Sequence, residues 1–372
     1  MKYAYLLILV VTIGCNSVKN VTTPFVATEK QNTGLEKSQI DLITNTLSNF
    51  HNNSELAIAL ITDNKVESFG CQRKNDTITW VNNSEKVFEI GSITKVFTTQ
   101  LLVELLQENK IKSLDESILP YLDFTIKGNP KITFRELADH TSGLPGNLSG
   151  NIFTTDASNP YKKWDREKFI KYFEQKVKLD SKPGEAYQYS NVGMALLAYA
   201  ICQIEKEDFE SLLQKNILIP LEMTQTTTKR DLVNNNLVEG YNWKGKPTSN
   251  WDMSEMAGAG AMLSTVNDLS NYLLWNFAAL NNQLSVMTQP SKSINSDMDV
   301  ALGWHILKNK TQNPFLWHNG GTGGYKSSMA LSLNNQTGVI ILSNIGATNN
   351  PIKAQIDKLC FDLMKSLENK DV

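Results

Sequence analysis

Hydrophobic and polar positions alternate differently at the ends of the chain and in its middle. Near the N-terminus, two apolar runs at 56–62 and 66–71 flank a polar turn at 63–65, a pattern that predicts a β-hairpin. Three further segments near the C-terminus have the composition of strands: 302–307, 327–333 and 338–343. The sequence therefore places strands at both ends.

The middle of the chain has helical periodicity instead. Apolar residues recur at helical spacing in seven segments: 96–107, 113–121, 133–139, 167–176, 192–204, 209–217 and 266–280. Helices are also predicted at 39–50 and 352–367. Terminal strands around a helical middle predict an α+β fold. Its antiparallel sheet would come from both chain ends and be flanked by helices, with a mostly helical subdomain at roughly 100–290.

The first 35 residues have the pattern of an export signal and a tether. Lys2 precedes an apolar run at 3–14, which is shorter than the ~20 residues needed to span a bilayer. The run ends next to Cys15, and residues 1–15 resemble a bacterial lipoprotein signal, which implies a lipid on Cys15 and an exported protein anchored in the cell envelope. A plain signal peptide is the alternative. The polar residues 16–35 predict a tether to a domain at 36–372.

Composition excludes some classes of protein. The 372 residues are 41% hydrophobic and 20% charged, which is typical of a globular protein. The 36 basic and 38 acidic residues give a formal net charge of -2, so no nucleic-acid partner is expected. The four histidines form no local pair with metal-ligand spacing, and we expect no metal site.

Three short motifs have residues suited to acyl transfer. In Ser92-Ile93-Thr94-Lys95, the serine and the lysine are three residues apart at a predicted helix start, so they would lie on one helical face. An amine next to a hydroxyl can take part in proton transfer, and a helix N-terminus favours a developing oxyanion. Alone, this motif would more often be a capped surface helix.

The second motif is Tyr189-Ser190-Asn191, at the end of a loop that leads into an apolar helix. Alternate residues of an extended loop point the same way, so Tyr189 and Asn191 could both face a cleft. A tyrosine beside a lysine can have its pKa lowered enough to act as a base. Asn191 could orient Lys95 or a substrate amide.

The third motif, His318-Asn319-Gly320-Gly321, continues into two further glycines before the predicted strand at 327–333. Glycines allow the backbone to approach a ligand closely. A glycine-rich hairpin without a functional role would explain the glycines, but it would not explain the histidine beside them.

Taken together, the motifs resemble those of the serine penicillin-recognising enzymes. The tyrosine in the second motif is similar to that of class C β-lactamases and their D,D-peptidase, D-amino-acid peptidase and esterase relatives. The flanking segments agree: FEIGSITKVFT, HTSGLP, PGEAYQYSNVG, AGAGAMLSTVNDL and HNGGTGGY. This resemblance covers roughly residues 36–365 and implies a β-lactamase/D,D-peptidase-like fold.

The resemblance also implies a role for each motif residue. Ser92 would be the acylated nucleophile, Lys95 would keep its neighbours in the right protonation state, and Tyr189 would be the general base. Asn191 would hydrogen-bond Lys95 and the substrate amide. The backbone N–H groups of Ser92 and Gly321 would form the oxyanion hole. No metal or organic cofactor is implied.

His318 and Asn319 depart from the family pattern, which has lysine and threonine at these positions. The family lysine helps to bind the substrate carboxylate, whereas an unperturbed histidine with a pKa of ~6.5 is largely neutral at pH 7. We therefore expect weaker or pH-dependent carboxylate binding, which favours a peptidase, amidase or esterase over an efficient β-lactamase. A further hypothesis is that His318→Lys improves turnover of anionic β-lactams; an unchanged or lower rate would contradict it.

Two classes of function are compatible with these residues. The first is a serine hydrolase that cleaves an amide or ester through an acyl-Ser92 intermediate, on a D-amino-acid peptide, a β-lactam or a small ester. The alternative is a lipoprotein that binds penicillin or peptidoglycan fragments without turnover. The presence of all four residues Ser92, Lys95, Tyr189 and Asn191 favours the enzyme. We expect a monomer whose partners are its substrate and, through Cys15, a membrane.

Overall fold

The computed structural model describes residues 34–148, 158–278, 282–308, 310 and 313–368. Cys15 and nearly all of the predicted signal and tether lie outside the described residues. None of the helices in the described part combines the length and the apolar character that crossing a membrane requires.

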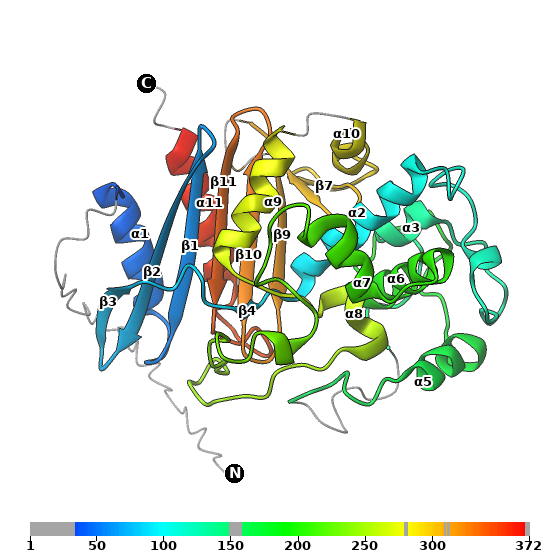
Figure 1. The fold of residues 1–372 in the computed structure, drawn as a ribbon, viewed down its shortest axis with the longest axis horizontal. Helices are drawn as coiled ribbons and strands as arrows, with labels where there is room; N and C mark the ends of the chain where they lie inside the picture. Colours follow the sequence, from blue (N-terminus) through cyan, green and yellow to red (C-terminus); the bar gives the residue numbers. More distant parts are fainter. Residues whose placement is uncertain (1–33, 149–157, 279–281, 309, 311–312, 369–372) are drawn as a thin grey trace, which may run out of the picture.

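A nine-stranded antiparallel sheet forms the centre of the fold (Figure 1). Its strand order is β3-β2-β1-β11-β10-β9-β8-β7-β6. The strands are β1 (Glu55–Thr62), β2 (Lys65–Lys74), β3 (Thr77–Val81), β6 (Lys292–Asn295), β7 (Met298–Val300), β8 (His305–Leu307), β9 (Phe315–Gly321), β10 (Lys326–Ser332) and β11 (Thr337–Ser343). The N-terminal β1 pairs directly with the C-terminal β11. The prediction of one antiparallel sheet built from both chain ends is confirmed.

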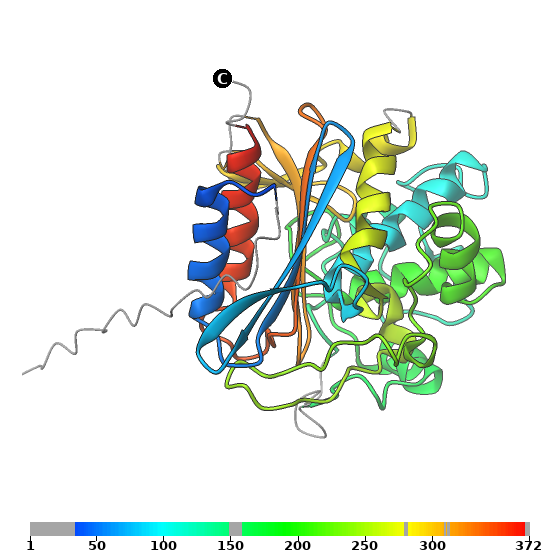
Figure 2. The ribbon, with the colours of Figure 1, turned by 60° about the vertical axis from the view of Figure 1, so that its left-hand side comes forward.

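Helices cover both faces of this sheet. On one face lie α1 (Lys37–Ser48) and α11 (Ala354–Glu368), which pack side by side (Figure 2). The side-chain amide of Gln39 in α1 donates to Ser366 Oγ in α11 at 3.0 Å. Ile58 of β1 points into the apolar cluster under these helices, while its neighbour Ala57 points to the opposite cluster. The central strands are therefore apolar on both faces, which explains their continuous hydrophobic runs.

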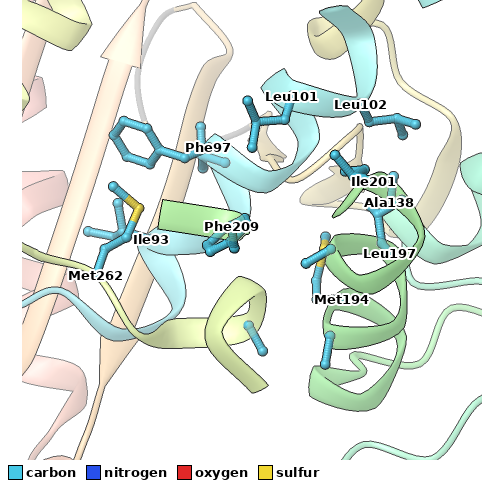
Figure 3. Close-up of a cluster of buried hydrophobic side chains, with 14 of the residues drawn as sticks. Ile93, Phe97, Leu101, Leu102, Ala138, Met194, Leu197, Ile201, Phe209 and Met262 are labelled. Carbon is cyan, nitrogen blue, oxygen red and sulfur yellow. The ribbon is translucent and has the colours of Figure 1, made fainter. Parts of the chain in front are cut away.

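The helical region lies against the other face (Figure 1). Its helices are α2 (Thr94–Gln107), α3 (Phe134–Ala138), α5 (Arg166–Lys171), α6 (Asn191–Glu205), α7 (Phe209–Leu213), α8 (Ala257–Gly260), α9 (Val266–Ala278) and α10 (Asn282–Thr288). Phe97 of α2, Leu197 of α6 and Phe209 of α7 belong to its apolar core (Figure 3). A short ribbon of β4 (Phe88–Glu89) and β5 (Leu263–Ser264) leads into the turn that carries Ser92.

The structure corrects several predicted elements. Only the last part of the strand predicted at 302–307 is extended, because the amide of Ala301 donates to the carbonyl of Trp304 and closes a turn there. The helix predicted at 113–121 is a single 3-10 turn at its end, Leu119–Tyr121. The four residues of the third motif lie just before β10, as predicted, but they are themselves the end of a strand, β9, that the sequence does not predict. The short strands β3, β6 and β7 were not predicted, because most of their side chains are only partly buried and show no clear alternation.

Candidate active site

Ser92 lies in a 3-10 turn, Gly91–Ile93, immediately before α2. The Lys95 side chain, one turn further on, places its Nζ atom 3.0 Å from Ser92 Oγ. The three-residue spacing thus brings the hydroxyl and the amine together, as the sequence predicts.

Lys95 is fully buried, and two further oxygens surround its amine. Nζ donates to Asn191 Oδ1 at 2.8 Å and to the carbonyl of Ala259 in α8 at 2.6 Å. Burial lowers the pKa of Lys95 well below its ordinary value, since the surrounding atoms solvate the charged form less well than water does. A neutral amine has two N–H groups for these two oxygens and a lone pair that can accept the proton of Ser92.

Tyr189 forms the next wall of the site. Its ring centroid lies 4.8 Å from Lys95 Nζ, and its hydroxyl hydrogen-bonds the Ser92 side chain. Burial raises the pKa of Tyr189, and the hydrogen bond from Ser92 only partly opposes that rise. The expectation of a lowered tyrosine pKa beside Lys95 is wrong for this geometry, because desolvation of the phenolate is the larger effect.

Asn191 is held by residues that the sequence analysis missed. Its Nδ2 donates to Asn147 Oδ1 at 2.8 Å, and the same oxygen accepts a bond from the Tyr161 hydroxyl at 3.0 Å. The amide group expected to meet a substrate therefore has a protein partner in the free site. Asn147 lies two residues after the flanking segment HTSGLP, which is the one signal that could have identified it.

The end of β9 lies directly against the turn that carries Ser92. A Cβ atom on Gly320 would lie 1.9 Å from the carbonyl oxygen of Ile90, so only glycine fits there. A Cβ atom on Gly91 would lie 2.6 Å from the amide nitrogen of Gly321. The turn that carries Ser92 thus lies directly against Gly321, the two residues whose backbone amides the resemblance implies for an oxyanion hole.

His318 belongs to a group of three buried histidines around Tyr189. The ring of His318 lies 6.2 Å from that of Tyr189 and 5.3 Å from that of His305, and the ring of His140 lies 4.5 Å from Tyr189. Burial lowers the pKa of His318, and the nearby His305 and Lys95 lower it further, so the imidazole is neutral at pH 7. Burial likewise lowers the pKa of His305 to about 4.

His140 and His305 each have a hydrogen bond that fixes them. The amide of Ser190 donates to His140 Nδ1 at 3.3 Å, so this histidine holds the loop that carries Tyr189. The Tyr187 hydroxyl and His305 Nε2 are 2.8 Å apart. Asn319 points away from this group, and its Nδ2 donates to Asp357 Oδ2 in α11 at 2.8 Å.

A cavity of about 580 Å³ opens in front of Ser92. Its lining includes residues from the turn, the loop before α6, three strands and the start of α11: Ser92, Tyr187, Tyr189, His305, Trp317, Asn319, Gly320, Gly321, Lys326, Ala347, Thr348, Asn349, Lys353, Ala354 and Asp357. Asn319, Gly320 and Gly321 of the third motif thus line the cavity. His318 does not belong to the lining given above. Within the described ranges, no group of three or more His, Cys, Asp or Glu side chains could hold a metal ion.

A half-buried serine beside a buried lysine, with a tyrosine and an asparagine, at the junction of an antiparallel sheet and a helical region, is typical of the penicillin-recognising class. Comparison with known families agrees, because residues 45–357 match the family described as Beta-lactamase. The chain belongs to the Beta-lactamase family, whose wider superfamily consists generally of serine hydrolases.

Individual relatives are distant. Beta-lactamase-like protein 4 of Dictyostelium discoideum is 30% identical over 320 residues, which are 76% of this chain and 54% of that protein. Protein flp of Staphylococcus aureus (strain MRSA252) is 26% identical over 284 residues, 71% of this chain and 54% of that protein. The chain thus spans about half the length of these relatives.

A similar fold is also known from a solved structure. The octameric penicillin-binding protein homologue from Pyrococcus abyssi has a TM-score of 0.74 and 21% sequence identity, with 90% of this chain and 77% of that chain covered. The similarity supports the β-lactamase/D,D-peptidase-like fold that the sequence predicts.

Proposed function

We propose that this protein is a serine hydrolase that cleaves an amide or ester bond through an acyl-Ser92 intermediate. One observation carries the proposal: the Ser92 hydroxyl lies 3.0 Å from an amine whose pKa is lowered by burial, and Ser92 lines a cavity. The substrate would be a D-amino-acid peptide, a β-lactam or a small ester, as in the class C β-lactamases and D,D-peptidases that the motifs resemble.

The geometry supports a sequence of proton transfers. Lys95 accepts the proton of Ser92 as Oγ attacks the carbonyl carbon, and the amides of Ser92 and Gly321 stabilise the resulting oxyanion. Tyr189 remains protonated in the free site, because burial raises its pKa. Its phenol is therefore suited to donate a proton to the leaving group and to recover one from the Lys95 ammonium.

Hydrolysis of the acyl-enzyme reverses these roles. Water takes the place of the leaving group, and the base that this step requires is again the neutral Lys95, acting directly or through Tyr189. The oxyanion forms against the same two amides. Release of the acid returns the proton to Ser92 Oγ, so the cycle consumes only water and substrate.

Intact-protein mass spectrometry tests the proposal. The full-length protein, Ser92→Ala and the control Ser38→Ala would each be incubated with penicillin and with an activated ester. Ser38 is an exposed residue of α1, on the opposite face of the sheet from the helical region. We expect wild type and Ser38→Ala to acylate or consume a substrate, and Ser92→Ala to do neither.

The pattern of products then identifies the activity. A stable penicillin adduct would indicate a penicillin-binding peptidase or receptor with slow deacylation, and consumption of penicillin would indicate a β-lactamase. Consumption of the ester alone would favour an esterase or D-peptidase. Reaction with neither compound would contradict the proposal and favour a binding lipoprotein. Reaction that persists in Ser92→Ala would contradict the role of Ser92 as the nucleophile.

We also propose that Cys15 anchors the exported protein in the cell envelope. The support is the sequence pattern of residues 1–15, and a lipid on Cys15 would place the catalytic domain at a membrane surface. The expected result is that the wild-type protein fractionates with bacterial membranes while Cys15→Ser is released into the soluble fraction. A variant that remains bound to the membrane would refute the anchor.

A further inference from the structure

The loop before α6 contributes two tyrosines to the active-site cavity. Tyr187 and Tyr189 both line it, whereas Gln188 between them does not belong to the lining. The backbone amide of Gln188 donates to the carbonyl of His140 at 2.8 Å, and that of Ser190 donates to the ring of the same histidine at 3.3 Å. His140 therefore holds the loop so that alternate side chains, the two tyrosines, face the cavity.

Tyr187 is paired with His305 of β8, which also lines the cavity. The hydroxyl oxygen and His305 Nε2 are 2.8 Å apart. The pKa of His305 is about 4, so its imidazole is neutral at pH 7 and has a single N–H. One atom of this pair therefore donates and the other accepts. Which of them donates determines what the tyrosine can offer to a ligand.

The surroundings of His305 decide the direction of this hydrogen bond. A backbone hydrogen bond to Trp317, which pairs with His305 across β8 and β9, favours a proton on the ring. Since Nε2 faces Tyr187, that proton belongs on Nδ1, and Nε2 is the acceptor. Burial raises the pKa of Tyr187, so its hydroxyl keeps the proton that it donates to Nε2. The described residues give this hydroxyl no second hydrogen bond, and its oxygen is left with lone pairs only.

The position of Tyr187 in the loop relates it to one side of the reacting bond. Tyr189 hydrogen-bonds the Ser92 side chain and is proposed to give its proton to the leaving group. Asn191 lies on one side of Tyr189, against Lys95, and Tyr187 precedes Tyr189 on the other. Residues that face the same way in an extended segment are about 6–7 Å apart. Tyr187 is therefore placed beyond the scissile bond, beside the leaving group.

We propose that Tyr187 is a specificity-determining residue whose oxygen accepts a hydrogen bond from an N–H group of the leaving group, with His305 as the positioning residue that holds its hydroxyl proton. The inference rests on the proposed hydrolase function and narrows its substrate class. A peptide-like leaving group has an amide N–H beyond the scissile bond, whereas a simple ester does not. An oxygen in the place of that N–H would meet lone pairs and leave the tyrosine without a donor.

Two esters that differ only in this N–H test the proposal. The benzoylglycine esters of N-methylglycolamide and of methyl glycolate share the scissile bond and nearly the same shape, but the second has an oxygen where the first has the N–H. We would measure kcat and KM for both with the full-length wild type, Tyr187→Phe and the control Tyr121→Phe. The control also removes one hydroxyl, which donates to Glu116 at 3.0 Å, and Tyr121 is not part of the cavity lining.

We expect wild type and Tyr121→Phe to prefer the amide-bearing ester about tenfold in kcat/KM, and Tyr187→Phe to lower this ratio to about one. His305→Gln can still accept the hydroxyl proton and should keep most of the preference. His305→Leu cannot accept it and should lose the preference, because the hydroxyl is then free to donate to either ester.

Three results would overturn the inference: a wild-type ratio of one, a preference for methyl glycolate, or a ratio that Tyr187→Phe leaves unchanged. If Tyr187→Phe does not fold, the wild-type ratio and the two His305 variants decide the matter. A ratio that His305→Leu leaves unchanged would then overturn the inference.

Calorimetric titration of the Ser92→Ala protein with both esters separates this inference from the hydrolase function. If Ser92 is never acylated but Ser92→Ala binds the amide-bearing ester more tightly, and Tyr187→Phe in that background abolishes the difference, the role of Tyr187 stands and the hydrolase function does not. If both esters are cleaved through Ser92 with equal kcat/KM, the hydrolase function stands and the role of Tyr187 does not. Cleavage of neither ester together with binding of neither would overturn the role of Tyr187.

Discussion

Lys95 is the residue whose protonation decides whether Ser92 can be activated. Its amine contacts three oxygen atoms, on Ser92, Asn191 and Ala259, and none of these is a carboxylate that would stabilise the ammonium. Burial therefore determines the direction of its pKa shift. Deprotonation of Lys95 is therefore easier in the folded protein than for a lysine in water.

The activity should consequently depend on pH through Lys95. The pKa of the amine is lowered, so the neutral form is present above that pKa, and kcat/KM should fall as the pH decreases through it. Lys95→Arg keeps a positive charge that cannot be removed, so we expect a loss of roughly 100-fold or more in ester hydrolysis at every pH. Rates measured from pH 4 to pH 10 would check both statements.

Lys358→Arg is the matched control for this substitution, because it makes the same chemical change on the exposed face of α11. A Lys95→Arg protein that keeps activity within tenfold of the control would show that Lys95 acts only through its charge. In that case Tyr189 would be the remaining candidate for the base.

At the scale of elements, β9 positions the site through its close approach to the Ser92 turn. Gly320→Ala would place a methyl group 1.9 Å from the Ile90 carbonyl oxygen, so the strand or the turn must move. We expect the free energy of unfolding to fall by about 1–3 kcal/mol, as for other overpacked positions. The proposed oxyanion amide of Gly321 would move too, so acylation should slow more than tenfold.

Denaturant unfolding and the rate of ester acylation would test this prediction on the same sample. Ser38→Ala again provides the control. A Gly320→Ala protein with unchanged stability and rate would show that β9 and the turn can separate freely, and it would remove the structural reason for the glycine.

The elements that the sequence predicts well are those with a strong period. The hairpin at 56–71 and the helices 192–204 and 352–367 have clear apolar patterns and appear as β1–β2, α6 and α11. The predicted Ser92–Lys95 contact follows from helical spacing alone. Asn147, Tyr161 and Ala259 could not be predicted in the same way, because loops and α8 bring them to the site from distant parts of the chain.

The ion pair between Lys326 and Asp357 illustrates the same limit. Lys326 lies just before the strand predicted at 327–333, and Asp357 lies within the helix predicted at 352–367. Their contact depends on how α11 packs on the sheet. The spacing of apolar residues within one segment does not show how that segment packs on another. The third motif could be recognised because its residues are adjacent in the sequence.

For the whole molecule, the buried histidines link stability to pH. In the folded protein the pKa of His305 is about 4, so its imidazole is neutral above that pH. In the unfolded chain the pKa of this histidine returns to ~6.5. Between these values the unfolded state binds more protons, so the free energy of unfolding rises with pH across this window and falls on acidification. One such histidine contributes at most about 1.4 kcal/mol per pH unit.

His305→Gln would isolate this contribution, since glutamine can still accept the hydrogen bond of Tyr187. We expect the slope of unfolding free energy against pH between 4 and 6.5 to decrease by up to one proton equivalent relative to wild type. Denaturant titrations of wild type and His305→Gln at several pH values would measure it. A slope equal to that of wild type would mean that His305 titrates normally in the folded protein.

The pairing of β1 with β11 has a consequence for how the protein is made. The strand that leaves the ribosome first has its second neighbour almost at the other end of the chain. The centre of the sheet therefore cannot close until nearly all of the polypeptide has been synthesised, and contacts of such long sequence separation form slowly. A nascent chain that stays open in this way can still be threaded through a translocation pore, which would suit the export that we propose from the pattern of residues 1–15.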